Sequence, residues 1–135
     1  MFRTRRLRKS EGIRRLVRET KLSVDDLIYP LFIEEGTNIE TEIVSMPGIK
    51  RFSLDRISKE LEEVVSLKIP AVLLFGIPSN KDDEGTETWN DTGIIQQAIR
   101  FIKKNYPSLY VISDVCFCEY TSHGHCGIVH DNDVD

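Results

Sequence analysis

The sequence predicts an α/β fold with a parallel β-sheet, on the evidence of three apolar runs and the helical patterns between them. The runs at residues 27–33, 71–75 and 109–112 have the length of buried strands. Both intervals between them carry apolar residues at helical spacing, and strands that alternate with helices are the signature of parallel sheets. The strand starts lie about 40 residues apart, which suits strand–helix units with long loops.

The composition is typical of one soluble globular domain. Of the 135 residues, 40% are hydrophobic and 30% are charged, which is enough for a real core. No apolar stretch approaches the roughly 18 residues that span a membrane, so no membrane partner is expected. The basic N-terminus is followed by no apolar segment and is therefore no secretory signal. With an odd number of cysteines, three, the sequence predicts a cytoplasmic protein with reduced thiols.

Residues 1–24 are predicted to form a basic N-terminal arm. Residues 1–21 carry nine Lys and Arg against two Glu, whereas the remainder carries nine against twenty Asp and Glu. Such an arm could bind nucleic acid, lie on the acidic surface of a neighbouring copy, or stay solvated. We favour the neighbouring copy and expect no nucleic acid, because the arm lacks interleaved Gly or aromatic residues. Ser10 is expected to cap a short helix with an apolar stripe formed by Ile13, Leu16 and Val17.

The start of the first strand and the cap of the first helix are predicted from single residues. Proline is normally confined to strand starts or edges, so the first strand is expected to begin at or just after Pro30. Residues 36–52 are predicted to be a loop with a turn at Pro47-Gly48. Ser53 is expected to cap the first of the two helices, with Asp55 stabilising its N-terminus. The buried face of this helix is predicted to contain Leu54, Ile57, Leu61, Val64 and Val65.

The second half of the chain leads to the third strand. Residues 76–90 form a polar, acidic loop, after which Asn90 or Asp91 is expected to cap the second helix. The inner face of that helix is predicted to contain Ile94, Ile95, Ala98, Ile99 and Ile102. The third strand then delivers Asp114 and the cysteines to its carboxyl end, where parallel α/β folds gather their functional groups.

All three cysteines, Cys116, Cys118 and Cys126, fall within eleven positions as C-x-C-x7-C. A structural zinc site would need four ligands, usually in paired C-x2-C units, and a disulfide would leave one thiol over. An open three-thiolate site leaves one coordination position for water or substrate, which is what catalytic zinc requires. This third interpretation is favoured, and buried inert cysteines remain the main alternative.

The other polar candidates near the thiols are Asp114 and three histidines. His125 is a candidate for a hydrogen bond that supports the metal site, whereas His123 and His130 are expected to be ordinary loop residues. Asp114 could orient a ligand or move protons. Its alternative role is to cap the loop by accepting hydrogen bonds from backbone N–H groups.

Residues 113–127, with the sequence SDVCFCEYTSHGHCG, resemble the metal-loop signature of 5-aminolevulinate dehydratase, also called porphobilinogen synthase. Five further segments resemble landmarks of that family in the same order, at residues 5–8, 16–20, 27–32, 46–49 and 74–78. The family has a zinc type with three cysteines in this loop and a type with aspartate and alanine instead. This chain resembles the zinc type.

The resemblance implies a TIM (β/α)8 barrel preceded by an arm that wraps a neighbouring subunit, commonly in a homo-octamer. Residues 1–24 would be that arm, and residues 25–135 the N-terminal, incomplete part of the barrel with about three of its strands. The implied reaction condenses two molecules of 5-aminolevulinate to porphobilinogen with loss of two waters, in haem and tetrapyrrole biosynthesis. Cys116, Cys118 and Cys126 would bind zinc, and Asp114 would orient the substrate amine or move protons.

The resemblance also implies residues that the sequence lacks. A TIM barrel takes about 250 residues, and the two lysines that hold substrate as Schiff bases in the family lie downstream of the segment present here. Residues 1–135 by themselves are therefore expected to be an inactive, truncated part of the enzyme. The alternative is a non-catalytic zinc-binding module that uses the three-cysteine loop.

Overall fold

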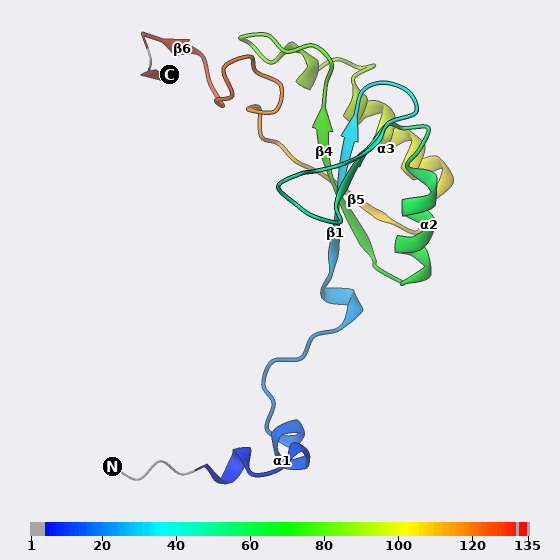
Figure 1. Cartoon of the computed structure of the whole chain (residues 1–135), viewed down its shortest axis with the longest axis vertical. Coiled ribbons are helices and arrows are strands. Elements are labelled where there is room, and N and C mark those ends of the chain that lie inside the picture. The colour runs from blue at the N-terminus through cyan, green and yellow to red at the C-terminus, as the bar shows by residue number, and fades with distance from the viewer. Residues whose placement is uncertain (1–4, 132, 135) are drawn as a thin grey trace.

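A five-stranded sheet organises the chain (Figure 1), whose computed structural model describes residues 5–131, 133 and 134. The strand order is β2-β3-β1-β4-β5, and every neighbouring pair is parallel except β2 with β3. The strands are β1 (Ile28–Glu34), β2 (Glu40–Glu42), β3 (Lys50–Phe52), β4 (Ala71–Ile77) and β5 (Tyr110–Ser113). The predicted α/β fold with three parallel strands is confirmed in β1, β4 and β5.

Two helices, α2 (Ser58–Ser66) and α3 (Ile94–Asn105), lie on the same side of this sheet (Figure 1). Their apolar stripes pack on alternate residues of the strands, because side chains of a strand point to opposite faces in turn. The fully buried contacts join α2 and α3 to β1 and β4 through Leu31, Ile33, Leu61, Val72, Leu74 and Ile102. The predicted inner face of α3 is confirmed, whereas that of α2 is wrong at Val65, which is exposed; Leu54 and Ile57 pack in or against the core but precede the helix.

The opposite face of the sheet carries half-buried aromatic and aliphatic side chains. Phe32 of β1 and Phe75 of β4 are partners in register and stack with ring centroids 5.1 Å apart. No helix of the described residues covers this face. Helices on one face and an apolar second face are what the first strands of a (β/α)8 barrel would show, since the second face lines the barrel interior.

The prediction that the first strand starts at or after Pro30 is wrong. β1 begins at Ile28, and Pro30 lies within it as the register partner of Leu73 in β4. On its other side β1 is paired with β3 only at Phe32 and Ile33. Because β1 has a free edge beside Pro30 in the described chain, the missing N–H of proline is tolerated there.

The prediction of a loop over residues 36–52 is also wrong, although the predicted turn is present. β2 and β3 form a hairpin, and the turn contains Gly48 at φ 83°, closed by a 3.0 Å bond from the Ile49 N–H to the Met46 carbonyl. These strands have three residues each and carry charges, with Lys50 and Glu40 forming a 2.7 Å ion pair. They therefore show neither the length nor the apolar alternation that indicates a strand.

Ser53 does not cap the first helix, which begins at Ser58. Ser53 is fully buried, and its hydroxyl accepts a hydrogen bond of 2.8 Å from the Ile39 N–H. Asp55 accepts one of 3.0 Å from the Asn38 N–H. Both side chains therefore stabilise the loop before β2 rather than a helix terminus. In either place a side-chain oxygen accepts a hydrogen bond from a backbone N–H group.

The cap predicted for the second helix is wrong in the same way. α3 starts after Gly93, without a side-chain cap. The Asn90 side chain instead accepts a 3.0 Å hydrogen bond from the Thr92 N–H, two residues on. Asn and Asp favour such local turns as strongly as helix caps, so the sequence pattern alone did not separate the two.

The N-terminal arm extends away from the sheet (Figure 1). Its helix α1 (Glu11–Leu16) is capped as predicted, with the Ile13 N–H donating to the Ser10 hydroxyl over 3.4 Å. Leu16 is 87% exposed and Val17 is also exposed, so much of the apolar stripe has no partner in the described residues. No helix that the structure describes is both long and apolar enough to cross a membrane.

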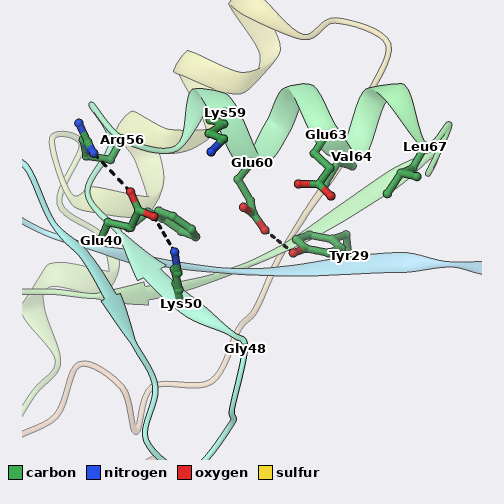
Figure 2. A pocket seen from close by; sticks show the side chains of 11 residues that line it. Tyr29, Glu40, Gly48, Lys50, Arg56, Lys59, Glu60, Glu63, Val64 and Leu67 are labelled. Atoms are coloured by element: carbon green, nitrogen blue, oxygen red, sulfur yellow. Dashed lines mark hydrogen bonds and ion pairs between the residues drawn. The ribbon is translucent and has the colours of Figure 1, made fainter.

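A cavity of about 360 Å³ lies between α2 and the β2–β3 hairpin (Figure 2). Glu40 pairs there with Lys50 and Arg56, and the Tyr29 hydroxyl donates to Glu60 of α2. Burial and the neighbouring Glu60 carboxylate raise the pKa of Tyr29 to about 12. None of the residues that line this cavity comes from the cysteine loop. The polar groups of the cavity join α2 to the sheet.

Candidate metal centre

The cysteine loop begins where β5 ends, at the carboxyl edge of the parallel strands. The Asp114 N–H still donates to the Leu74 carbonyl of β4 over 3.1 Å, and the chain leaves the sheet after it. This is the predicted position of Asp114 and the thiols. Parallel strands end together at this edge, so side chains that follow one strand meet loops that follow its neighbours.

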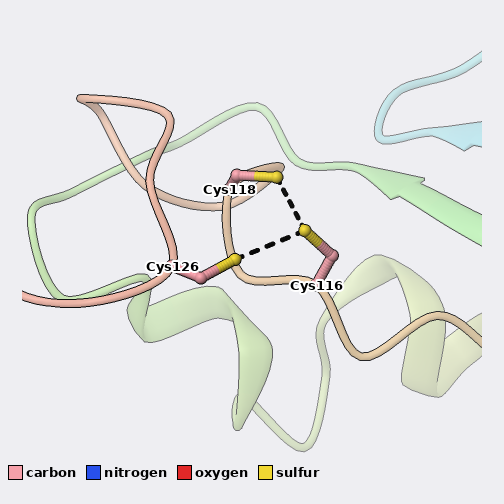
Figure 3. A group of neighbouring side chains, drawn as sticks. All are labelled: Cys116, Cys118 and Cys126. Carbon is pink, nitrogen blue, oxygen red and sulfur yellow. Dashed lines mark hydrogen bonds between the residues drawn. The ribbon is translucent and has the colours of Figure 1, made fainter.

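The loop brings the three sulfur atoms together (Figure 3). The Sγ of Cys116 lies 2.7 Å from that of Cys118 and 3.3 Å from that of Cys126. All three lie within 4.8 Å of one another, which suits three sulfurs bound to one ion at about 2.3 Å each. Among the described residues, no histidine or carboxylate joins this group. The donor set therefore fits an open three-thiolate metal site.

Contact between the thiols changes their acidity. Hydrogen bonding to Cys118 raises the pKa of Cys116 to about 12, whereas the hydrogen bond with Cys116 lowers the pKa of Cys126. A sulfur that accepts a neighbour's proton is stabilised as thiolate, and the donor holds its proton more tightly. A metal ion that binds all three sulfurs must therefore displace protons from the group.

Asp114 is half-buried beside the thiols. One oxygen of its carboxylate accepts a 2.9 Å hydrogen bond from the Val115 N–H, which is the loop-capping role. Asp114 also lines a cavity of about 220 Å³ together with Cys116 and Tyr120. The carboxylate thus borders a space next to the sulfur group, and its role toward a substrate stays a prediction.

The histidines do not belong to the group of three sulfurs. The rings of His123 and His125 stack with centroids 5.9 Å apart, and the His125 N–H donates to Nδ1 of His123 over 3.2 Å. Nε2 of His123 lies 3.2 Å from the Asp83 carbonyl oxygen. His123 is therefore more than an ordinary loop residue. His130 is exposed on β6 (Val129–His130), and the supporting role of His125 stays a prediction.

Sequence reasoning missed the residues that hold the loop. Tyr120 and Thr121 are buried, at 8% and 4% exposure. The Tyr120 hydroxyl lies so close to Gly76 of β4 that a Cβ there would sit 2.3 Å from it. The aromatic ring of Tyr120 in an otherwise polar segment was the available signal, whereas Thr121 gave none, because threonine is usually exposed.

Fold and site together define an α/β protein with a three-cysteine loop, suited to a metal ion, at the carboxyl edge of its sheet. The family model for delta-aminolevulinic acid dehydratase matches residues 1–135. The chain belongs to this family.

Named relatives agree with this membership. The chain is 50% identical over 132 residues to a delta-aminolevulinic acid dehydratase of Halalkalibacterium halodurans, covering 98% of this chain and 40% of the relative. It is 53% identical over 133 residues to one of Ruminiclostridium josui, covering 98% and 65%. The chain thus spans less than two thirds of the length of these relatives.

A solved structure extends the likeness to three dimensions. The delta-aminolevulinic acid dehydratase of Toxoplasma gondii ME49, in complex with the reaction product porphobilinogen, superposes with a TM-score of 0.90 at 34% identity. The match covers 100% of this chain and 39% of that one. The arm, the sheet and the cysteine loop of this chain therefore have the architecture of the corresponding part of that protein.

Proposed function

We propose that this protein acts as a porphobilinogen synthase, condensing two molecules of 5-aminolevulinate with loss of two waters, in haem and tetrapyrrole biosynthesis. The observation that carries the proposal is a group of three thiols, whose sulfur atoms lie within 4.8 Å of one another at the carboxyl edge of the sheet. Asp114 lines the same cavity as one of these thiols. Membership of the dehydratase family supports it, as does the product held by the Toxoplasma gondii relative.

The metal proposed for Cys116, Cys118 and Cys126 is zinc. Zinc binds thiolates readily, and three protein ligands leave its fourth position open. When bound, zinc would supply a Lewis acid that polarises a substrate oxygen or activates a water. Cys116 lines the same cavity as Asp114, so an ion held by the thiols would lie next to that space.

Asp114 is proposed to act on the substrate amine. Its carboxylate borders the cavity beside the thiols, where it would attract an ammonium group and accept its proton. The hydrogen bond from the Val115 N–H fixes the carboxylate in place. A fixed acceptor orients a substrate better than a mobile one, because less entropy is lost on binding.

The activity is proposed for a chain of the length that the relatives have, and residues 1–135 alone are proposed to be inactive. A lysine that forms a Schiff base needs a desolvated environment that lowers its pKa. Lys103 and Lys104 at the end of α3 are exposed and do not provide one. Porphobilinogen formed by residues 1–135 alone would contradict this part of the proposal.

The proposed assembly is a cytoplasmic homo-oligomer, an octamer in the fully assembled form, held partly by the N-terminal arm. The exposed apolar side chains of α1, in a strongly basic segment, support a contact with another copy. A helix of six residues is marginal by itself and gains stability from docking.

The test of the proposed activity is porphobilinogen formation from 5-aminolevulinate by the full-length protein and its Asp114→Asn variant. We expect the variant to lose about 100-fold or more in kcat, because the amide no longer accepts a proton. Cobalt(II) binding by the thiols should stay normal. Asp91→Asn makes the same chemical change at an exposed loop residue and should leave kcat unchanged.

The second candidate function is a non-catalytic zinc-binding module, which the three thiols would also support. It predicts metal binding without porphobilinogen formation in the full-length protein. Normal cobalt(II) binding with no product from the unmodified protein would favour this candidate over the enzyme.

A further inference from the structure

The seven residues between Cys118 and Cys126 do not form a free loop. The chain turns inward after Cys118, where the Tyr120 and Thr121 N–H groups both donate to the Phe117 carbonyl, over 2.8 and 3.1 Å. Thr121 is 4% exposed, and its hydroxyl donates to the His125 carbonyl over 3.0 Å. The segment therefore descends to the core at Thr121 and returns to Cys126.

This buried segment docks on the acidic loop that follows β4. The Ser122 N–H donates to the Asp82 carbonyl over 2.9 Å, and Asp82 and Thr121 form an isolated parallel bridge. The Asp83 carbonyl lies 3.2 Å from Nε2 of His123, and the Ser122 hydroxyl donates to the Asp83 carboxylate. The backbone of residues 82–83 thus serves as the platform for residues 121–123.

The platform is held in shape by the carboxylate of Asp82. Its Oδ1 accepts hydrogen bonds from the Glu84 N–H at 3.1 Å and the Thr86 N–H at 2.9 Å. These bonds close a tight turn in which Gly85 has φ 68°, a left-handed conformation that glycine adopts without strain. A Cβ at Gly85 would lie 3.4 Å from Cγ2 of Thr121, so the turn packs directly against the buried segment.

We infer that Asp82 is a positioning residue for the thiol group: its carboxylate folds the platform, and the platform sets Cys126 beside Cys116 and Cys118. The inference rests on the proposed metal site and adds to it a residue that binds no metal. Without the platform, the segment between the second and third thiols would be a flexible loop. Closing that loop would then oppose metal binding, because ordering a flexible segment costs entropy.

The test is a cobalt(II) titration of the purified protein, followed by its thiolate-to-cobalt charge-transfer bands. Asp82→Ala removes the acceptor oxygens and should weaken cobalt binding about tenfold, the lower end of what lost supporting residues cost metal sites. Asp82→Asn keeps an acceptor oxygen and should bind nearly as tightly as the unmodified protein. At saturation the bands should be unchanged in both, since the three sulfurs still bind.

The matched control is Glu62→Ala, which also removes one exposed carboxylate, on α2, outside the hydrogen bonds that the structure describes. It should leave both cobalt affinity and the circular dichroism spectrum unchanged. An Asp82→Ala variant that binds cobalt as tightly as the unmodified protein overturns the inference. Equal losses in Asp82→Ala and Asp82→Asn also overturn it, because charge and not the acceptor oxygen would then matter.

Failure of the proposed metal site would look different. In that case the unmodified protein would show no thiolate-to-cobalt bands at all, or bands that Cys126→Ser leaves unchanged. Normal bands in the unmodified protein, with no effect of Asp82→Ala, would remove the positioning role alone.

Discussion

At the scale of single residues, the chemistry is concentrated in three sulfur atoms with unequal surroundings. Cys116 lies between the other two and hydrogen-bonds to both, while Cys126 is exposed and comes from the far end of the loop. Cys126 is also the thiol whose pKa is lowered by its neighbour. The position of Cys126 depends most on the loop, so it is the residue whose replacement tests the group most directly.

We expect Cys126→Ser to abolish most of the thiolate-to-cobalt charge-transfer absorption, because the remaining pair of sulfurs no longer surrounds an ion. Absorption spectra during cobalt(II) titration measure this effect. His130→Ala is a suitable control, since it removes an exposed potential ligand outside the sulfur group. Unchanged bands in Cys126→Ser would exclude Cys126 from the site.

Metal affinity should fall as the pH falls, because protons compete for the sulfurs. Cys116 has a pKa raised to about 12, so in the neutral range it is protonated before the ion binds and must release its proton. Affinity should therefore rise with pH, and binding in weakly buffered solution should release protons. Cobalt(II) dissociation constants between about pH 6 and pH 8 would show the trend, and a flat profile would speak against thiolate ligands.

At the scale of elements, the loops after β4 and β5 fold as one unit on the end of the sheet. Gly76 is where the two meet, because the Tyr120 hydroxyl of the second loop lies against the β4 backbone. Ile95 of α3 also lies within 2.6 Å of the position that a Cβ at Gly76 would occupy. This strand position thus accepts no side chain without movement of the cysteine loop or of α3.

Gly76→Ala should destabilise the protein by about 1–3 kcal/mol, the usual cost of overpacking a well-packed site. Thermal unfolding monitored by circular dichroism measures the loss. Tyr120→Phe removes the hydroxyl and should restore part of the stability in the double variant. Gly12→Ala in α1 is the control, since no atom lies within 4 Å of its added Cβ. A stable Gly76→Ala protein would show that the loop is not packed on β4.

At the scale of the whole molecule, two apolar surfaces stand out because the described residues leave them partly uncovered. One is the face of the sheet with the Phe32–Phe75 stack, and the other is the stripe of α1 with Leu16. The first suits the interior of a barrel, and the second suits contact with another copy. Because the arm extends away from the sheet, a substitution in the stripe of α1 can change assembly without changing the core.

Leu16→Asp should reduce the assembled mass of the full-length protein, because it places a charge in the apolar stripe of the arm. Sedimentation velocity measures the distribution of species. Val44→Asp makes the same kind of change at a side chain that is 96% exposed in the turn between β2 and β3, and it should leave the mass unchanged. An assembly unaffected by Leu16→Asp would exclude this stripe from the contact.

Much of the fold and of the site was predictable from local sequence. The runs that became β4 and β5 are continuous and apolar, which is typical of parallel strands, and β4 is the more buried of the two. The spacing of the three cysteines likewise indicated one site. The β2–β3 hairpin was not predictable in this way, because its strands are short, charged and stabilised by pairing with β1.

The sequence by itself determined the parallel α/β class, the helix faces, and the place of Asp114 and the thiols after the third strand. Each of these depends on residues close together in the chain, through periodicity, burial or spacing. Only the tertiary structure decided that residues 82–83 support residues 121–123, about 40 positions away, and that Gly76 makes room for Tyr120. Such contacts depend on the register between β4 and β5, which places two distant loops at the same edge of the sheet.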